Sequence, residues 1–232
     1  MARLKAVLFD LDDTLYPERA FVRSGFKAAA AFAEQELGIG RSTGFEELWA
    51  YFESGVRGST YNLWLEAHGA DTERWVPQLV EVYRSHKPEI ELYPGVRQLL
   101  KTLCARTPLG LITEGNTTTQ RNKLAALDLE AMFGVVVITD MKERSFWKPH
   151  MRPYINALDK LGVEAARSVY IGDNPRKDFF GARQLGMHTV RVKWPEGLNT
   201  LLQADSPAYE ADISLPNFDN LLEVLASFEE ES

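Results

Sequence analysis

The chain has 232 residues, 45% hydrophobic and 25% charged, which is enough apolar content for a full hydrophobic core. Its net charge of −7 argues against a general nucleic-acid binder, which would present a basic face. It has no run of about 18 apolar residues, so we expect no membrane partner. The first strand begins too early for a signal peptide. The single cysteine, Cys104, allows no internal disulfide and is expected in the core. Together these features predict a cytoplasmic protein.

The first predicted strand, residues 4–10, ends in a cluster of acids: Asp10, Asp12 and Asp13. A short apolar run that stops at a carboxylate is typical of a buried parallel strand whose end lies at the ligand-binding edge of an α/β sheet. Carboxylates held this close repel one another, and burying them is costly unless a cation is present. A bound divalent metal explains the cluster best, and a solvated acidic turn is the alternative. For Asp13 itself we expect the solvated turn.

From about Pro17 to His86 the pattern is helical and aromatic, without a β-rich run. Apolar periodicity with glycine breaks predicts four helices, near 21–37, 46–53, 61–68 and 75–83. We therefore expect an all-helical cap, residues 17–87, inserted between the first strand and its crossover helix. A linker at 88–95 returns the chain to the core.

Beyond the linker, strands and helices alternate. We expect helices at 95–105, 117–127, 151–161, 178–185 and 217–228, and strands at 109–113, 135–138, 168–172, 188–192 and 211–214. This alternation predicts an α/β fold with a doubly wound parallel, Rossmann-like sheet. Residues 1–16 and 88–232 would form this core.

Two later strands also end in groups suited to chemistry. Strand 109–113 ends in Thr113, and strand 168–172 ends in Gly172, followed at once by Asp173 and then by Asp178. Between these strands, Lys148 lies in a loop-like segment. Each piece alone is a weak signal, and the order of the pieces along the chain makes them specific.

In this order the segments resemble the four motifs of the haloacid dehalogenase-like (HAD) superfamily, in its subfamily with a small helical cap after the first strand. Residues 10–14 match the first motif, DxDxT, and Thr113 matches the second. Lys148 matches the third, and residues 172–178 match the fourth, GDxxxxD. The resemblance covers nearly the whole chain.

The resemblance implies a Mg²⁺-dependent phosphatase that acts on a small phosphorylated metabolite through an aspartyl-phosphate. Asp10 would be the nucleophile, and the Asp12 side chain would act as general acid and then general base. Mg²⁺ would be held by the carboxylates of Asp10 and Asp173 and by the backbone carbonyl of Asp12. Lys148 would neutralise Asp10 and bind the phosphoryl group.

The resemblance also suggests supporting roles for five residues. The Thr113 hydroxyl would hold a phosphoryl oxygen, and Glu114 would contact the substrate or be an ordinary loop carboxylate. Asp178 would orient the lysine of the third motif or a metal-bound water, and Thr14 would brace the second aspartate. Asn174 would either touch the site or cap the following helix.

Three alternatives stay open. A phosphomutase would use the same two aspartates but would keep water from the aspartyl-phosphate. A haloacid dehalogenase needs no metal and lacks the second aspartate as acid and base, so Asp12 favours hydrolysis at phosphorus. A non-catalytic binding or regulatory module on this fold would not need the complete set of motifs. We expect a monomer or homodimer.

The predicted cap carries aromatic and basic side chains that either select the leaving group or form the core of the cap. For the tryptophans we expect the core, and for Arg23 and Arg57 an effect on substrate choice. The full set is Phe21, Arg23, Lys27, Trp49, Tyr51, Arg57, Tyr61 and Trp64.

Overall fold

The structure, a computed structural model, describes residues 4–140 and 145–230, so the outermost ends of the expected core lie outside it. One parallel sheet of six strands forms its centre, in the order β3-β2-β1-β4-β5-β6. The direction of the order reverses at β1, as in a doubly wound Rossmann-like sheet, and the predicted fold class is confirmed. The strands are β1 (Ala6–Phe9), β2 (Leu109–Glu114), β3 (Val135–Thr139), β4 (Ser168–Gly172), β5 (His188–Val192) and β6 (Ile213–Leu215).

The sheet is covered by helices on both faces, which explains why β1 reads as a continuous apolar run. Val7 and Phe9 belong to the core cluster shared with α5 (Val96–Cys104) and α9 (Leu221–Glu230). Leu8 points to the opposite face, into the cluster shared with α7 (Arg152–Leu161) and α8 (Phe180–Gln184). The remaining core helix, α6 (Thr117–Ala126), follows β2. β1 is therefore fully enclosed, and its end is a rigid support for a site.

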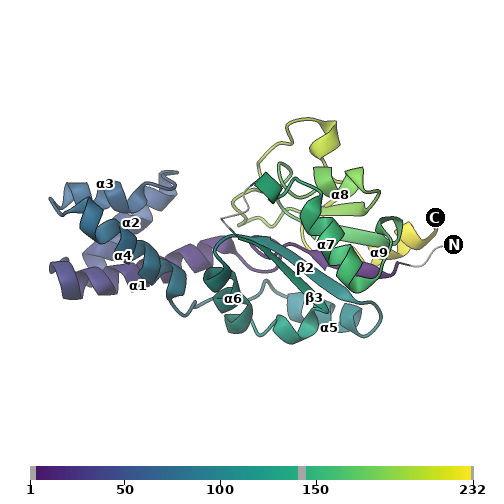
Figure 1. The fold of residues 1–232 in the computed structure, drawn as a ribbon, viewed down its shortest axis with the longest axis horizontal. Coiled ribbons are helices and arrows are strands. Elements are labelled where there is room, and N and C mark those ends of the chain that lie inside the picture. The colour runs from purple at the N-terminus through teal and green to yellow at the C-terminus, as the bar shows by residue number, and fades with distance from the viewer. Residues whose placement is uncertain (1–3, 141–144, 231–232) are drawn as a thin grey trace.

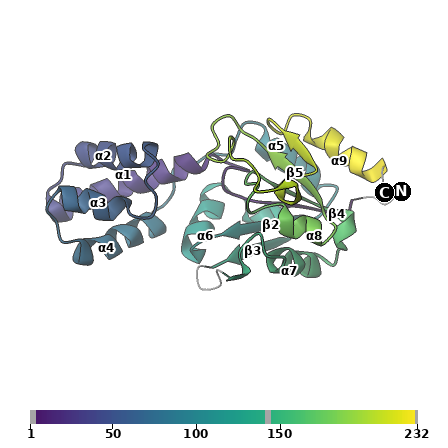
Figure 2. The same cartoon turned by 90° about the horizontal axis from the view of Figure 1, so that it is seen from above.

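The remaining four helices form a separate bundle, here called the helical block: α1 (Glu18–Leu37), α2 (Arg41–Glu53), α3 (Thr60–Ala67) and α4 (Thr72–Ser85). The block lies at one end of the molecule, and the chain termini lie at the other (Figures 1 and 2). It has its own apolar cluster, in which Trp64 is 1% exposed and Trp49 packs at the edge. The expectation that these tryptophans serve the core of the block is confirmed.

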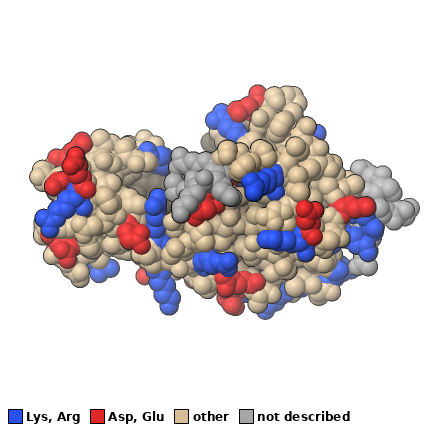
Figure 3. All heavy atoms as spheres, in the orientation of Figure 1, with Lys and Arg blue, Asp and Glu red and all other residues tan. Residues whose placement is uncertain are grey.

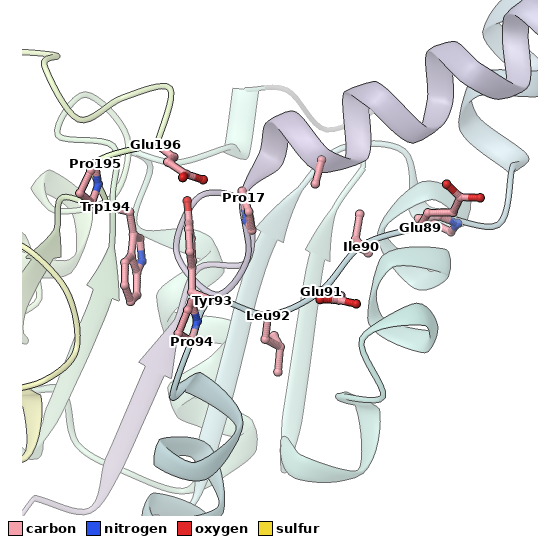
Figure 4. Close-up of a pocket in the computed structure, with 12 residues that line it drawn as sticks. Pro17, Glu89, Ile90, Glu91, Leu92, Tyr93, Pro94, Trp194, Pro195 and Glu196 are labelled. Carbon is pink, nitrogen blue, oxygen red and sulfur yellow. The ribbon is translucent and has the colours of Figure 1, made fainter.

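The block joins the core through two neighbouring segments. The outgoing segment passes directly from the β1 loop into α1, and the return segment contains Tyr93. The Tyr93 ring stacks on Trp194 with centroids 4.1 Å apart, and the two rings lie side by side in Figure 4. The Tyr93 N–H also donates to the Leu15 carbonyl at 3.0 Å. The end of the return segment is therefore anchored to the outgoing one.

The expectation that Asp13 is a solvated turn residue is wrong. Its side chain is 1% exposed, and one carboxylate oxygen accepts from the Glu18 N–H at 2.8 Å. The other oxygen accepts from the Leu198 N–H, also at 2.8 Å. Asp13 has a left-handed backbone with a φ of 52°, which turns its carboxylate toward these two amides. It therefore fastens the first turn of α1 to a loop of the core.

Other differences from the sequence prediction are local. The helix expected from residue 178 begins at Phe180, because Asp178 is held in the preceding loop by hydrogen bonds. The last helix begins at Leu221 instead of residue 217, after a turn in which Asn217 accepts from the Asp219 N–H. Cys104 is exposed, because α5 buries its other face. Within the described ranges, no helix is both long and apolar enough to cross a membrane.

Candidate active site

The carboxyl ends of two neighbouring strands bring three carboxylates together. Asp10 follows β1, and Asp173 follows β4, which pairs with β1 in parallel. Asp178 returns to the same place from the next loop. Each contributes an oxygen to a group whose atoms all lie within 4.8 Å of one another, and all three residues are buried. A buried acidic cluster therefore exists at these strand ends, but its side chains are those of Asp10, Asp173 and Asp178 and not the predicted run of Asp10, Asp12 and Asp13.

Lys148 lies in the middle of this cluster. Its ammonium is 2.6 Å from an oxygen of Asp10 and 2.6 Å from an oxygen of Asp178. It also donates to the Tyr170 hydroxyl at 3.0 Å, and the residue is 6% exposed. The expectation that Asp178 orients the lysine agrees with this geometry. A lysine with three buried acceptors has little freedom to move, so it presents a fixed positive charge beside Asp10.

Sterics explain why a glycine, Gly172, ends β4 directly before Asp173. The second oxygen of Asp178 accepts from the backbone N–H groups of Asp173 at 3.1 Å and Asn174 at 2.8 Å. A Cβ atom on Gly172 would lie 2.5 Å from that same oxygen. Only glycine lets the carboxylate approach closely enough to bind both amides, and these bonds fix the loop that carries Asp173.

The electrostatics of the cluster favour an added cation. Burial raises the pKa of Asp10 to about 8; Lys148 opposes this shift and Asp178 adds to it. Burial, together with repulsion from Asp178 and Asp10, raises the pKa of Asp173 well above its usual range. Burial alone would lower the pKa of Lys148, but Asp10 and Asp178 outweigh it and raise that pKa. One ammonium thus faces three buried carboxylates, an arrangement that costs free energy unless more positive charge is present.

The open oxygens of the cluster suit a divalent metal. One oxygen of Asp173 accepts from the Asn199 amide at 2.9 Å, and one oxygen of Asp10 binds Lys148. In the part of the chain that the structure describes, nothing donates to the other oxygen of either residue. Two free carboxylate oxygens on neighbouring strand ends are hard donors of the kind that Mg²⁺ prefers. The donor set therefore fits such an ion.

The side chain of Asp12 is held apart from this cluster by residues that the sequence analysis did not single out. One of its oxygens is 2.6 Å from the Lys123 ammonium, and the other accepts from the Gln120 amide at 2.9 Å. The Tyr16 hydroxyl also donates to it. Thr14 was expected to brace Asp12, but its buried hydroxyl has no hydrogen-bond partner among the described residues. Burial would raise the pKa of Asp12, but the charge and hydrogen bond of Lys123 outweigh it and lower that pKa.

The remaining predicted residues lie at the same edge of the sheet with different tasks. The Thr113 hydroxyl is buried and accepts from Gln120, so in this structure it supports the residue that holds Asp12. Glu114 accepts from the Lys148 backbone N–H and lies 3.2 Å from the Lys177 ammonium. Asn174 accepts from the Arg176 N–H within its own loop, so it closes a turn and does not cap α8.

Two adjoining hollows surround these groups. The smaller, about 120 Å³, is lined by Asp10, Asp12, Lys148, Asp173 and Asp178 among others. The larger, about 700 Å³, lies between the helical block and the core, and its wall includes aromatic side chains of the block: Phe21, Phe26, Phe52, Tyr61 and Tyr83. A third groove, about 790 Å³, lies along the return segment and is lined by Tyr93 and Trp194, away from the carboxylate cluster (Figure 4).

The basic residues expected to select the substrate separate into two groups. Arg57 lines the larger hollow. Arg23 is exposed, and its guanidinium lies 5.8 Å from the ring centroids of Phe45 and Trp49. Lys27 forms an ion pair with Glu89 at 2.9 Å. Neither Arg23 nor Lys27 is part of the wall of the hollow, so of these three predicted residues Arg57 alone is placed to meet a substrate. On the face shown in Figure 3, basic and acidic side chains are interspersed.

A helical signal could have identified two of the missed residues. Gln120 and Lys123 are three residues apart on α6 and therefore share one face, and both are at most 4% exposed. Two buried polar side chains on one helix face indicate partners across that face. Asn199 offered no comparable signal, because it comes from an irregular loop after β5.

Known proteins resemble this chain over most of its length. The family model described as haloacid dehalogenase-like hydrolase matches residues 7–192. The glyceraldehyde 3-phosphate phosphatase of Methanopyrus kandleri is 35% identical over 82% of this chain and 84% of its own. A HAD phosphatase structure from Thermococcus onnurineus is 25% identical, covers 96% of this chain and 98% of its own, and has a TM-score of 0.62. The 2-haloacid dehalogenase of Pseudomonas syringae pv. Tomato DC3000 is also 25% identical, covers 97% and 99% of the two chains, and has a TM-score of 0.64. The chain belongs to the haloacid dehalogenase-like hydrolases.

Proposed function

We propose that the protein is a Mg²⁺-dependent phosphatase that hydrolyses a small phosphate monoester through an aspartyl-phosphate on Asp10. The observation that carries this proposal is the position of Lys148, 2.6 Å from both Asp10 and Asp178 in a buried acidic cluster. A carboxylate is a poor nucleophile toward a phosphate dianion, because both are negative. The lysine, together with a cation on the open oxygens of Asp10 and Asp173, offsets that repulsion.

The chemistry follows from the residues in two steps. In the first, an oxygen of Asp10 forms a bond to phosphorus while the ester bond breaks, and Asp12 gives its proton to the leaving oxygen. In the second, water attacks phosphorus and Asp12 takes a proton from that water, while the bond between phosphorus and the Asp10 oxygen breaks, so phosphate leaves and the carboxylate of Asp10 is regenerated. The low pKa of Asp12 beside Lys123 suits this second, basic role. Mg²⁺, when bound to Asp10 and Asp173, supplies positive charge that favours an in-line approach.

We also propose that residues 17–87 act as a cap on a core made of residues 1–16 and 88–232. Two features support this division: the block has its own apolar cluster, and the larger hollow is lined from both the block and the core. The chain crosses between the parts at two adjacent segments, and α4 also contacts α6 of the core through hydrogen bonds. A hinge motion at these segments would let the block close over the strand ends and exclude water.

The similarity to a phosphatase at 35% identity supports the phosphatase reading over the dehalogenase reading. The presence of Asp12 at the boundary of both hollows supports it as well, because that residue is the acid and base that phosphate hydrolysis needs. Of the other candidates, a phosphomutase shares this arrangement and a binding module would need none of it.

The test is hydrolysis of p-nitrophenyl phosphate with and without Mg²⁺, by the wild type and by Asp10→Asn. We expect activity that requires the metal, is lost to a chelator and returns when Mg²⁺ is restored. Asp10→Asn should lose at least about 10³-fold in kcat, because the amide has the same shape but cannot attack phosphorus. The exposed Asp159→Asn is the matched control and should behave as the wild type. Retention of activity within tenfold in Asp10→Asn would remove the nucleophile assignment.

A further inference from the structure

Glu18 lies where the two hollows meet. Six residues line both the small acidic hollow and the larger one beneath the helical block: Asp12, Glu18, Glu114, Asn174, Lys177 and Asn199. The phosphoryl group of a substrate has to reach Asp10 in the small hollow, while the leaving group occupies the larger one. The residues shared by both hollows therefore surround the ester bond and the first atoms of the leaving group.

Glu18 differs from the other charged residues of this set. Asp12 is paired with Lys123 at 2.6 Å, and Glu114 is paired with Lys177 at 3.2 Å. The carboxylate of Glu18 accepts no hydrogen bond and forms no ion pair with any residue that the structure describes. The backbone of Glu18 is nonetheless fixed, because its N–H donates to Asp13 at 2.8 Å.

The surroundings of the Glu18 side chain favour binding of a hydrogen-bond donor. Burial raises its pKa to about 7, repulsion from Asp12 adds to this shift, and attraction to Lys123 opposes it. Glu18 is half-buried and lines both hollows, so its unpaired carboxylate can accept a hydrogen bond from a molecule bound there. A ligand with a second negative charge at this place would be repelled instead.

We propose that Glu18 is a specificity-determining residue that accepts a hydrogen bond from a hydroxyl or ammonium group of the leaving group, close to the ester bond. This inference rests on the phosphatase function proposed above and narrows its substrates to phosphate esters of polyols or amino alcohols. Glu18 acts here by selecting the substrate and takes no part in the bond-breaking steps.

The test compares two pairs of esters that differ in the donor group. Glycerol 3-phosphate is paired with propyl phosphate, and ethanolamine phosphate with ethyl phosphate, each measured as kcat/KM. A hydrogen bond to a charged group predicts a wild-type preference of about tenfold or more for the donor-bearing member of at least one pair. In Glu18→Ala that preference should fall to about twofold or less. Glu18→Gln keeps an acceptor oxygen, so it should retain part of a hydroxyl preference and lose an ammonium preference.

The matched control is Glu36→Gln, which removes a carboxylate from an exposed position on the same helix. Its preferences should equal those of the wild type. If Glu18→Ala hydrolyses both members of each pair in the wild-type ratio, the inference about Glu18 is wrong and the phosphatase proposal stands. If the wild type hydrolyses none of the four esters and no p-nitrophenyl phosphate, both the phosphatase proposal and the inference about Glu18 are wrong. Glu18→Gln preserves the shape of the side chain, so it decides the matter if the alanine variant does not fold.

Discussion

Lys123 on α6 and Asp12 in the loop after β1 form an ion pair, with the ammonium 2.6 Å from a carboxylate oxygen. The lysine side chain is 5% exposed and the aspartate side chain 20% exposed, so solvent screens the pair only weakly. The Lys123 ammonium also lies 4.3 Å from the centroid of the Phe21 ring, which belongs to the helical block. The proposed acid and base is thus held by a core helix at a point that the block also touches.

Lys123→Met should lower kcat by about ten- to a hundredfold, because Asp12 loses the partner that fixes its side chain. Burial would then be opposed by the hydrogen bonds of Tyr16 and Gln120 without the lysine charge, so the pKa of Asp12 would rise. The acidic limb of the pH–rate profile should therefore move to higher pH, because a stronger acid is replaced by a weaker one. The measurement is kcat against pH with p-nitrophenyl phosphate. An unchanged profile would show that Lys123 does not set the protonation of Asp12.

Asp173→Asn should separate metal binding from folding. Without metal the variant should be as stable as the wild type or more stable, because a buried carboxylate that repels Asp10 and Asp178 has been removed. In the wild type, Mg²⁺ at about 100 times its Kd should add about 2.7 kcal/mol to the free energy of unfolding. The variant should lose that increment. Urea unfolding with and without Mg²⁺ checks this, and a variant that keeps the full increment would remove Asp173 as a ligand.

Arg57→Ala should change the order of preference across a panel of phosphate esters, whereas Arg23→Ala should leave that order unchanged. The reason is their placement: Arg57 lines the larger hollow, and Arg23 lies over the outer Phe45 and Trp49 rings. Both variants remove the same charge from the same block, so each serves as the control for the other. Equal effects of the two substitutions would mean that the block acts through its overall charge.

Asp13→Ala should destabilise the protein by about 2–4 kcal/mol, because it leaves the N–H groups of Glu18 and Leu198 without their acceptor. Asp128→Ala is the matched control, since Asp128 also has a left-handed backbone, with a φ of 49°, but a side chain that is 93% exposed. The strain of placing alanine in that conformation is common to both, so the difference reports the lost hydrogen bonds. If the two variants have equal free energies of unfolding, the two hydrogen bonds of Asp13 do not stabilise the protein.

The strand ends and the doubly wound parallel class of the sheet could be predicted from the sequence because they depend on local signals and on the alternation of strands and helices. An apolar run that stops at a polar residue marks the end of a buried strand, and this placed Asp10, Thr113 and Asp173 at one edge. The partners of Asp12 could not be predicted in this way. Gln120 and Lys123 reach it only because the fold places α6 beside the loop after β1, a contact between residues more than 100 positions apart.

The prediction that Asp13 is a solvated turn residue was wrong for a related reason. Next to two acids in a short loop, a third carboxylate normally points to water, and its two backbone partners become visible only once the chain is folded. One of these partners, Leu198, is 185 positions away. Pairings of this kind depend on the packing of irregular loops, for which the sequence has no period.

The position of β1 has a consequence for how such a protein changes over evolutionary time. β1 is hydrogen-bonded on both sides, to β2 and to β4, so a mutation that shifts Asp10 has to disturb three strands at once. The helical block is connected to the core by two adjacent chain segments and contributes no strand to the sheet. Selection is therefore free to reshape the wall above the site, and with it the range of molecules admitted, while the reacting groups below remain where they are.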